Sequence, residues 1–505
     1  MALLILQSRY GMAQPIQLIP QNESEVEQGQ FSAPFPSSPS LSEFWKGTPP
    51  SVIETYFPKL PLILTSPVLQ DLRKQIVKEK YSELLQNVAY EKMILSLLIE
   101  GGEWEQAKEF LMEAHLPEKE ASFLDLYWLA GDSKKACEKI NNLIRTSSNM
   151  EWKKQNIYCL YLNGEEERAK IAAEILSDLN PAAVQFVNTL FNHSSQVSWD
   201  DSIAKSPFLL TVWLESQQDI PEAALNKLSS SCLALIARSQ KAPLPTRLLA
   251  AEKALQQGTF KSEDFLVLLK EAPQANLWGQ FMHELQSPKT ETLLPLFDRA
   301  AQMKKLGLVG KIFSSLLSSL NPSLEMLPLA PFMIQAFLQG DKPELAKKWG
   351  GFLMREVPEE AVAFLPLLHL AFPENKWGES QMQAWQAYEK RTHVQHAVQR
   401  SYEMRRILDT LAEPSGQPMK GEPSPPSWRR EKALFDEQAA TLLESAAVSK
   451  RKGEVLLLVL TMVGETPLDE ISIDKLALLL KALFKAGFKE EARALALEYL
   501  LNKGV

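Results

Sequence analysis

One local pattern recurs at the borders between apolar blocks and restricts the fold of this chain more than any other feature. A glycine is followed by four residues and then an alanine, at Gly102 and Ala107, Gly131 and Ala136, Gly164 and Ala169, and Gly487 and Ala492. Glycine ends a helix readily in the left-handed conformation, and a small alanine lets the next helix approach closely. Each copy therefore predicts two helices joined by a tight turn and packed through the alanine.

The spacing of these turns indicates a repeated unit. The first three glycines stand 29 and 33 residues apart, and a looser copy with one extra residue runs from Gly340 to Ala346. An acidic residue follows the glycine in four of the five turns, where it complements the positive end of the next helix. Between the turns, blocks of roughly 12 to 20 residues carry apolar side chains at three- and four-residue spacing.

The same blocks favour helix over strand throughout the chain. Leucine and alanine dominate their apolar positions, while valine and isoleucine are scattered and no convincing alternation of apolar and polar residues occurs. Leucine and alanine are strong helix formers, whereas strands favour β-branched residues. The connections are short, so successive helices are expected to lie antiparallel. We predict an all-α fold.

The repeated turns resemble those of the tetratricopeptide repeat, a helix-turn-helix unit of about 34 residues. The best copy matches the family's glycine, aromatic and two alanine positions at Gly102, Trp104, Ala107 and Ala114, and Gly487, Phe488 and Ala492 match nearly as well. The likeness extends over about 75–181 and the last forty or so residues, without the family's signature on the first helices. It implies a right-handed helical-hairpin solenoid of degenerate, tetratricopeptide-like repeats.

A second resemblance concerns the N-terminal part of the chain. The segment Phe44-Trp45-Lys46-Gly47-Thr48-Pro49-Pro50, which leads into Leu60-Pro61, is similar to the N-terminal part of an uncharacterised group of alphaproteobacterial helical-repeat proteins. This resemblance implies no activity. It favours export, because that group carries signal sequences.

Composition divides the chain into four segments. Residues 14–41 are rich in Gln, Ser, Pro and Glu, and a stretch of this kind buries too little to offset its ordering entropy. We expect a disordered arm over 1–42, which includes a possible remnant of a signal sequence, and a helical-repeat solenoid over 43–412. A Pro-rich linker or loop is expected over 413–428, followed by helix pairs over 429–505 that either continue the solenoid or fold back on it.

Charge and apolar content exclude several classes of protein. The 505 residues carry 54 Lys and Arg against 62 Asp and Glu, a net charge of −8, and nucleic-acid binding normally shows as a basic excess. No apolar run approaches the ~20 residues of a membrane-spanning helix, so no transmembrane segment is expected. Cys137, Cys159 and Cys232 are too few, and odd in number, for a disulfide framework.

The compartment stays open between two alternatives. Residues 2–6 are apolar but too few for a secretory signal, whereas Tyr10-Gly11-Met12-Ala13 has the small residues of a cleavage site. A start codon assigned too late would produce this pattern. The protein is then periplasmic or otherwise exported, and it is cytoplasmic if the start is correct.

Motifs that carry chemistry are incomplete. Gly307-Leu-Val-Gly310-Lys311 differs from a phosphate-binding loop in its glycine spacing and has Ile312 where Ser or Thr would hold magnesium, so we expect a turn between helices. His393 and His396 lie three apart on an expected helix, with Glu389 one turn earlier, but a complete metal set is missing. We predict no catalytic residue, cofactor or metal.

One basic cluster is the candidate surface for a partner. It comprises five residues of an expected helix: Lys390, Arg391, Arg400, Arg405 and Arg406. Such a patch suits an acidic partner or phosphate groups, although a solvated helix face interleaved with Glu is the simpler explanation.

Helical solenoids expose long grooves and serve recognition more often than chemistry. We therefore expect a non-enzymatic scaffold or adaptor that binds a protein or peptide partner in its groove. The alternative is a bacterial cell-envelope enzyme, or an accessory of one, that acts on glycan. That alternative requires a glutamate of strongly raised pKa beside a deep pocket. A nucleic-acid-binding repeat protein ranks last, because only one basic cluster is visible.

Overall fold

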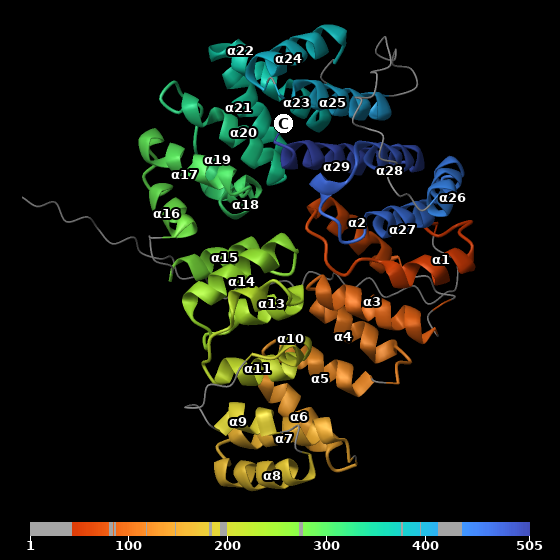
Figure 1. Cartoon of the computed structure of the whole chain (residues 1–505), viewed down its shortest axis with the longest axis vertical. Coiled ribbons are helices and arrows are strands. Elements are labelled where there is room, and N and C mark those ends of the chain that lie inside the picture. Colours follow the sequence, from red (N-terminus) through yellow and green to blue (C-terminus); the bar gives the residue numbers. More distant parts are fainter. Residues whose placement is uncertain are drawn as a thin grey trace, which may run out of the picture. The chain divides into compact units, whose positions relative to one another are not determined.

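Every regular element that the structure describes is a helix (Figure 1). The structure is a computed structural model, and it describes residues 43–79, 84, 87–117, 119–146, 148–180, 184–191, 199–271, 276–374, 377–393, 395–412 and 437–504. These residues belong to one compact unit, and the all-α prediction is confirmed for them. The predicted arm and the Pro-rich segment lie outside the described residues. No described helix has the length and apolarity to cross a membrane.

The first half of the described residues forms short helices. Their bounds are α1 (Pro50–Tyr56), η1 (Phe57–Lys59), α2 (Pro67–Lys78), α3 (Val88–Glu100), α4 (Trp104–Glu113), α5 (Lys119–Leu129), α6 (Ser133–Leu143), α7 (Met150–Leu162), α8 (Glu166–Leu179), α9 (Val184–Phe191), α10 (Asp201–Lys205), α11 (Pro207–Glu215), α12 (Glu222–Leu225), α13 (Ser230–Arg238) and α14 (Leu244–Gln256).

The second half continues in the same way. It comprises α15 (Ser262–Leu269), α16 (Leu277–Glu284), α17 (Thr290–Gln302), α18 (Leu306–Ile312), α19 (Ser314–Ser318), η4 (Leu327–Leu329), α20 (Ala330–Gln339), α21 (Pro343–Glu356), α22 (Pro358–Ala361), η5 (Val362–Phe364), α23 (Leu365–Ala371), α24 (Glu379–Thr392), α25 (Ala397–Leu411), α26 (Glu437–Val448), α27 (Lys452–Val463), η6 (Leu468–Glu470), α28 (Ile473–Ala486) and α29 (Lys489–Asn502).

The glycines of the repeated pattern all stand at helix ends with a positive φ, between +71° at Gly131 and +101° at Gly487. In each turn, the amide after the glycine donates to the carbonyl five residues earlier, as from Asp132 N to Tyr127 O at 2.9 Å. This bond closes a Schellman turn, which satisfies a carbonyl that the helix end leaves free. The alanines of the pattern are fully buried: Ala107, Ala136, Ala169 and Ala492.

The looser copy uses its residues differently. Gly340 has an ordinary φ of −86°, and Asp341 takes the left-handed conformation instead, with φ of +57°. Gly340 is needed for space, because an added Cβ would lie 2.7 Å from the backbone carbon of Gly310. Close approach of two helices, rather than the turn, therefore requires glycine at this position.

The C-terminal helices fold back on the start of the chain. Helix α27 packs against α1 and α2, α28 packs against α25, and α29 packs against α2, α20 and α23 (Figure 1). Trp45 is 1% exposed and covers Gly453, whose amide donates to Phe44 O at 2.9 Å. The Phe44-Trp45 segment thus joins the beginning of the described chain to the turn between α26 and α27.

Two hydrophobic cores hold these helices together. The larger core runs through most of the described unit, from Trp45 to Leu501. A smaller core lies among α5 to α9 and α11, around the contacting rings of Trp128, Tyr158 and Phe208. The helices α6 to α9 therefore pack around a local core of their own.

Candidate functional site

The predicted basic cluster is divided between two helices, and acidic partners meet four of its five charges. Lys390 and Arg391 end α24, whereas Arg400, Arg405 and Arg406 lie on α25. Lys390 is exposed. The ion pairs join Arg391 to Glu359 at 3.3 Å, Arg400 to Glu389 at 3.2 Å, and Arg405 to Asp409 and Arg406 to Asp474 at 4.0 Å each. The cluster lies on the packed region between α24, α25 and α28, and its role in partner binding stays a prediction.

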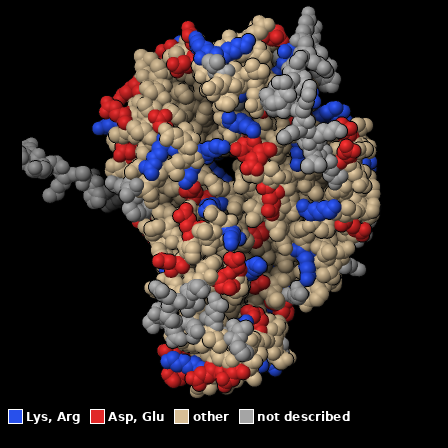
Figure 2. Space-filling view, viewed as in Figure 1, with Lys and Arg blue, Asp and Glu red and all other residues tan. Residues whose placement is uncertain are grey.

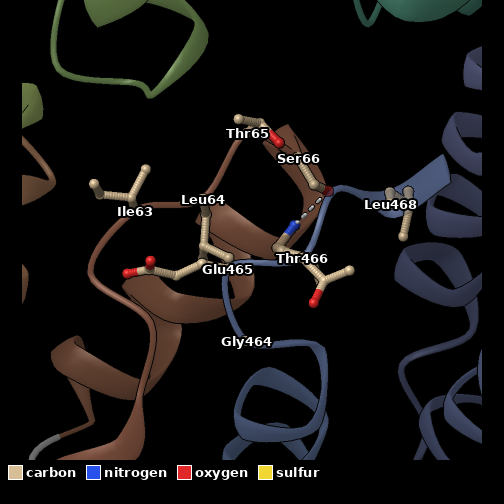
Figure 3. Close-up of a pocket in the computed structure, with 9 residues that line it drawn as sticks. Ile63, Leu64, Thr65, Ser66, Gly464, Glu465, Thr466 and Leu468 are labelled. Atoms are coloured by element: carbon tan, nitrogen blue, oxygen red, sulfur yellow. Dashed lines mark hydrogen bonds between the residues drawn. The ribbon is translucent and has the colours of Figure 1, made fainter. Parts of the chain in front are cut away.

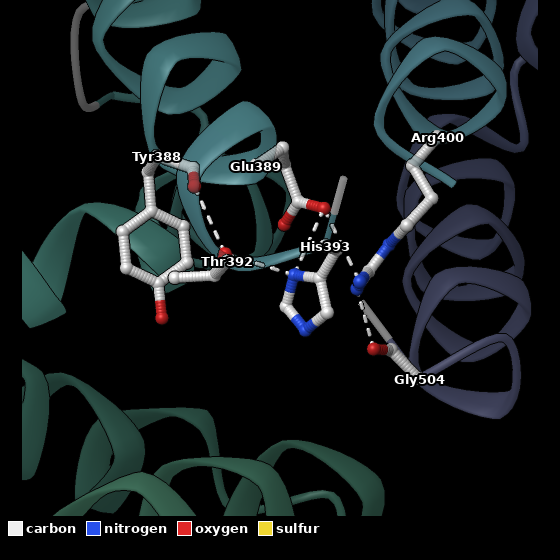
Figure 4. Close-up of polar contacts among 6 residues, drawn as sticks. All are labelled: Tyr388, Glu389, Thr392, His393, Arg400 and Gly504. Carbon is white, nitrogen blue, oxygen red and sulfur yellow. Dashed lines mark hydrogen bonds and ion pairs between the residues drawn. The ribbon is translucent and has the colours of Figure 1, made fainter. Parts of the chain in front are cut away.

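Glu389 is the centre of the polar contacts in this region (Figure 4). Its side chain is 2% exposed, and its Oε2 lies 3.2 Å from both His393 Nδ1 and an Arg400 guanidinium nitrogen. Arg400 also donates to the carbonyl of Gly504, just beyond α29. Burial lowers the pKa of Arg400, while Glu389 acts in the opposite direction. These contacts join α24, α25 and the residues just after α29, so Glu389 and Arg400 stabilise the packing of these helices.

The expectation that His393 and His396 share a helix is wrong. Helix α24 ends at Thr392 and α25 begins at Ala397, so both histidines lie in the turn between these helices. His393 caps the end of α24, where its amide donates to Glu389 O at 2.8 Å. The described residues contain no group of three or more potential metal ligands.

The expectation that Gly307 to Lys311 forms a turn between helices is wrong, because this segment is helical and makes a tight helix crossing. It lies within α18, and a Cβ on Gly310 would come to 1.8 Å from the carbonyl oxygen of Ala336 on α20. Both glycines face α20, since a Cβ on Gly307 would meet Gln339 at 3.0 Å. The glycine spacing therefore serves close packing of α18 on α20. Lys311 points elsewhere and donates to Leu255 O at 3.3 Å, at the end of α14.

A small open pocket lies where the N-terminal segment meets the loop after α27 (Figure 3). Its empty volume is about 210 Å³, and it lies between residues 63–66 and the loop 464–468. Ser66 Oγ caps α2 here by accepting from Leu69 N at 3.2 Å. The pocket is open to solvent and does not form an enclosed cavity.

Glu498 on α29 accepts a hydrogen bond at 2.7 Å from the Oγ of Ser66, which lines this pocket. Burial raises the pKa of Glu498 to about 7, although hydrogen bonds from Ser66 and the Val68 amide act against the rise. The carboxylate faces the first turn of α2, where a helix favours negative charge. Sequence reasoning missed this contact because 432 residues separate its two side chains.

This raised pKa predicts how stability depends on pH. A carboxyl group whose pKa is raised by folding stabilises the fold below its ordinary pKa, and this stabilisation is lost as pH rises through 7. In wild type, the free energy of unfolding should fall by up to about 1.4 kcal/mol per pH unit between the ordinary pKa of glutamate and the raised pKa of Glu498. The Glu498→Gln variant should not show this fall. Urea unfolding at pH 5 and pH 8 measures it. The control is Glu465→Gln, at an exposed residue, which should keep the wild-type pH dependence of stability. The same pH dependence in both variants would show that Glu498 does not cause it.

The space-filling view shows an opening in the middle of this face, with basic and acidic side chains around it (Figure 2). In the same view the helices α2, α15, α18 and α29 surround it (Figure 1). Lys311 on α18 interacts electrostatically with Lys74 and Asp71 on α2, so these helices face one another. Burial and Lys74 lower the pKa of Lys311. Lys74 itself is 44% exposed and lies 3.6 Å from Glu103.

A disulfide joins Cys137 on α6 to Cys159 on α7, whereas Cys232 is a buried free thiol. The cysteine count, which is too low and odd for a disulfide framework, did not predict this single bond. No spacing motif marks it, because the two residues lie 22 apart on separate helices and meet only when the helices pack. The bond belongs to the smaller hydrophobic core.

The disulfide predicts a measurable stability difference. Closing a loop of this length stabilises a fold by about 3 kcal/mol in the chain-entropy description. We expect the double variant Cys137→Ser, Cys159→Ser to lose about this much free energy of unfolding. Reductant should lower the wild-type unfolding midpoint toward that of the double variant and leave the double variant unchanged. A wild-type midpoint that ignores reductant would show that the bond is absent in solution.

Comparison with known proteins adds no relative to this picture. The chain matches no protein-family model, and neither the curated proteins nor the solved structures contain a significant match.

Proposed function

We propose that this protein is a non-enzymatic scaffold or adaptor whose array of tetratricopeptide-like helix pairs binds a protein or peptide partner in a groove. The observation that carries the proposal is the opening between α2, α15, α18 and α29, with charged side chains around it (Figures 1 and 2). The recurring Schellman turns with buried alanines support the repeat architecture. A right-handed solenoid and its kinship to the tetratricopeptide repeat remain part of the proposal.

Charged side chains on α2 and α18, two of the helices around the opening, suit a partner that carries both signs of charge. Lys74 and Glu103 pair at a distance of 3.6 Å and are both solvent-accessible, so each can exchange its partner for a group on a bound peptide. Lys311 lies deeper and adds positive charge near Lys74. Polar side chains at such an opening supply orientation and specificity, while buried anchors of the partner supply affinity.

The glycan-enzyme alternative meets only half of its requirement. Glu498 has the raised pKa that a general acid needs, but its carboxyl group is held by Ser66 and the Val68 amide at a packing contact. The adjacent pocket is small and open to solvent. The alternative is therefore the less favoured proposal.

The disulfide favours the exported alternative for the compartment. Disulfides form and persist in oxidising environments and are rare in the cytosol. Both side chains of the Cys137–Cys159 pair are buried in the smaller core. We therefore place the protein outside the cytoplasm in this proposal, and the N-terminus of protein purified from its native cells tests that placement.

Affinity capture from native cells with the full-length chain tests the function. The comparison uses wild type, Lys74→Glu on α2, and Lys46→Glu, whose side chain is 77% exposed and lies in the N-terminal segment. We expect one protein partner to be retained by wild type and Lys46→Glu and to bind purified Lys74→Glu at least tenfold more weakly. Equal retention by all three variants would place the partner elsewhere. Enrichment of cell-wall glycan in place of protein would favour the enzyme alternative.

A further inference from the structure

Helix α8 carries an apolar stripe on the face that it turns to solvent. Ile171, Ile175 and Leu179 are 58%, 55% and 64% exposed, and they follow one another at four-residue spacing. The opposite face is buried through Ala169, Ala173 and Leu176 on the smaller core. The helix is therefore apolar on two sides, and only one of these sides has a partner among the described residues.

A terminal helix of a repeat array normally presents a polar outer face, because that face replaces the next repeat with water. Helix α8 lies at one end of the described unit in Figure 1 and departs from this rule. Scattered exposed apolar residues need no explanation, but a continuous stripe on one helix marks a docking surface. The i, i+4, i+8 spacing is that of a helix-in-groove or helix-on-helix contact.

Acidic side chains lie along one side of this stripe. Glu167, Glu174 and Asp178 follow one another at helical spacing and are all exposed. Figure 2 shows acidic residues gathered at the same end of the unit. Lys170 pairs with Glu166 at 2.9 Å and Glu167 at 3.5 Å, and Arg168 pairs with Glu165, so both basic side chains of α8 are engaged. Glu174 and Asp178 leave the helix with a net negative charge.

The charge pattern selects the kind of partner. Two copies of α8 packed on each other antiparallel would set Glu167 and Glu174 of one chain near Asp178 of the other, and like charges destabilise such pairs. A partner helix with an apolar stripe flanked by Lys or Arg would cover the apolar stripe of α8 and also pair with its acidic side chains. We propose that the outer face of α8 docks a basic amphipathic helix of a partner protein. This surface is separate from the central opening and does not depend on a partner bound there.

Fluorescence anisotropy with the full-length chain tests this docking site. The probe is a synthetic amphipathic helical peptide with a leucine stripe flanked by lysines. Two matched peptides carry glutamate in place of the lysines, or the same residues with the stripe scrambled. We expect the lysine peptide to bind at least tenfold more tightly than either matched peptide.

Variants assign the binding to α8. Ile175→Ser and Glu174→Lys should each weaken the lysine peptide at least fivefold, whereas Val267→Ser, an equally exposed apolar side chain on α15, and Lys74→Glu should not change it. Unchanged thermal melting confirms that the variants fold. Equal binding of the three peptides, or full binding to Ile175→Ser, would overturn the proposal. The proposal would also be overturned if wild type formed a dimer that Ile175→Ser abolishes. The same holds if wild type adsorbed to neutral phosphatidylcholine vesicles and Ile175→Ser did not.

Discussion

The Gly310→Val variant should lose at least about 3 kcal/mol of its free energy of unfolding, or fail to fold. A Cβ at this position would lie 1.8 Å from the carbonyl oxygen of Ala336 and 2.6 Å from its carbonyl carbon. Both are backbone atoms of α20, so no side-chain rotation relieves the overlap. The two helices must separate, and the contacts between Gly310 and Gly340 would separate with them.

Gly351 provides the matched control for this prediction. It also lies inside a helix, α21, but a Cβ there meets nothing within 4 Å. Gly351→Ala should therefore leave the stability unchanged or raise it by about 0.5–1 kcal/mol, because alanine is the better helix former. Urea unfolding of both variants measures the difference. Similar losses in the two would mean that α18 and α20 do not cross as closely as described.

The Trp45→Ala variant should lose about 3–5 kcal/mol, the range for truncating a buried tryptophan. Trp45 is 1% exposed, its ring covers Gly453, and its Nε1 donates to the carbonyl of Glu79. The ring meets Phe44 edge-on at a centroid distance of 5.1 Å. Removing it opens a cavity between the N-terminal segment and the turn that begins α27.

The position of this cavity makes the loss local. Hydrogen exchange followed by mass spectrometry should show faster exchange in α26, α27 and the first described residues than in α6 to α9. The half-buried Trp152→Ala should cost less and leave α26 and α27 protected. Uniform acceleration across all helices in Trp45→Ala would instead show that the unit unfolds as a whole.

Local features of the fold could be predicted from the sequence. Helix periodicity, the positive φ of Gly131 and the burial of Ala136 depend on residues within a few turns of one another. Such signals act over short stretches of chain, where spacing alone decides which side chains share a face. The looser copy shows the limit, since whether Gly340 or Asp341 takes the left-handed conformation depends on how close α18 lies.

Features that join distant segments could not be predicted. The Cys137–Cys159 bond and the contact of Ser66 with Glu498 need a tertiary arrangement before the residues meet. The basic cluster shows the converse, because Arg406 and Asp474 neutralise each other across two helices that are remote in sequence. A cluster of charge in the sequence therefore does not define a charged surface.

Because α27 and α29 pack on α1 and α2, these early helices complete their packing only late in synthesis. Ser66 at the start of α2 can contact Glu498 only after α29 has left the ribosome, and Trp45 can pack on Gly453 only after α27 has done so. At about 5–20 residues per second, 432 residues take on the order of tens of seconds to synthesise. During that interval the N-terminal segment exposes the apolar surface that α27 and α29 will cover. We therefore expect chaperones that hold apolar segments to bind this nascent segment until α27 and α29 have been synthesised.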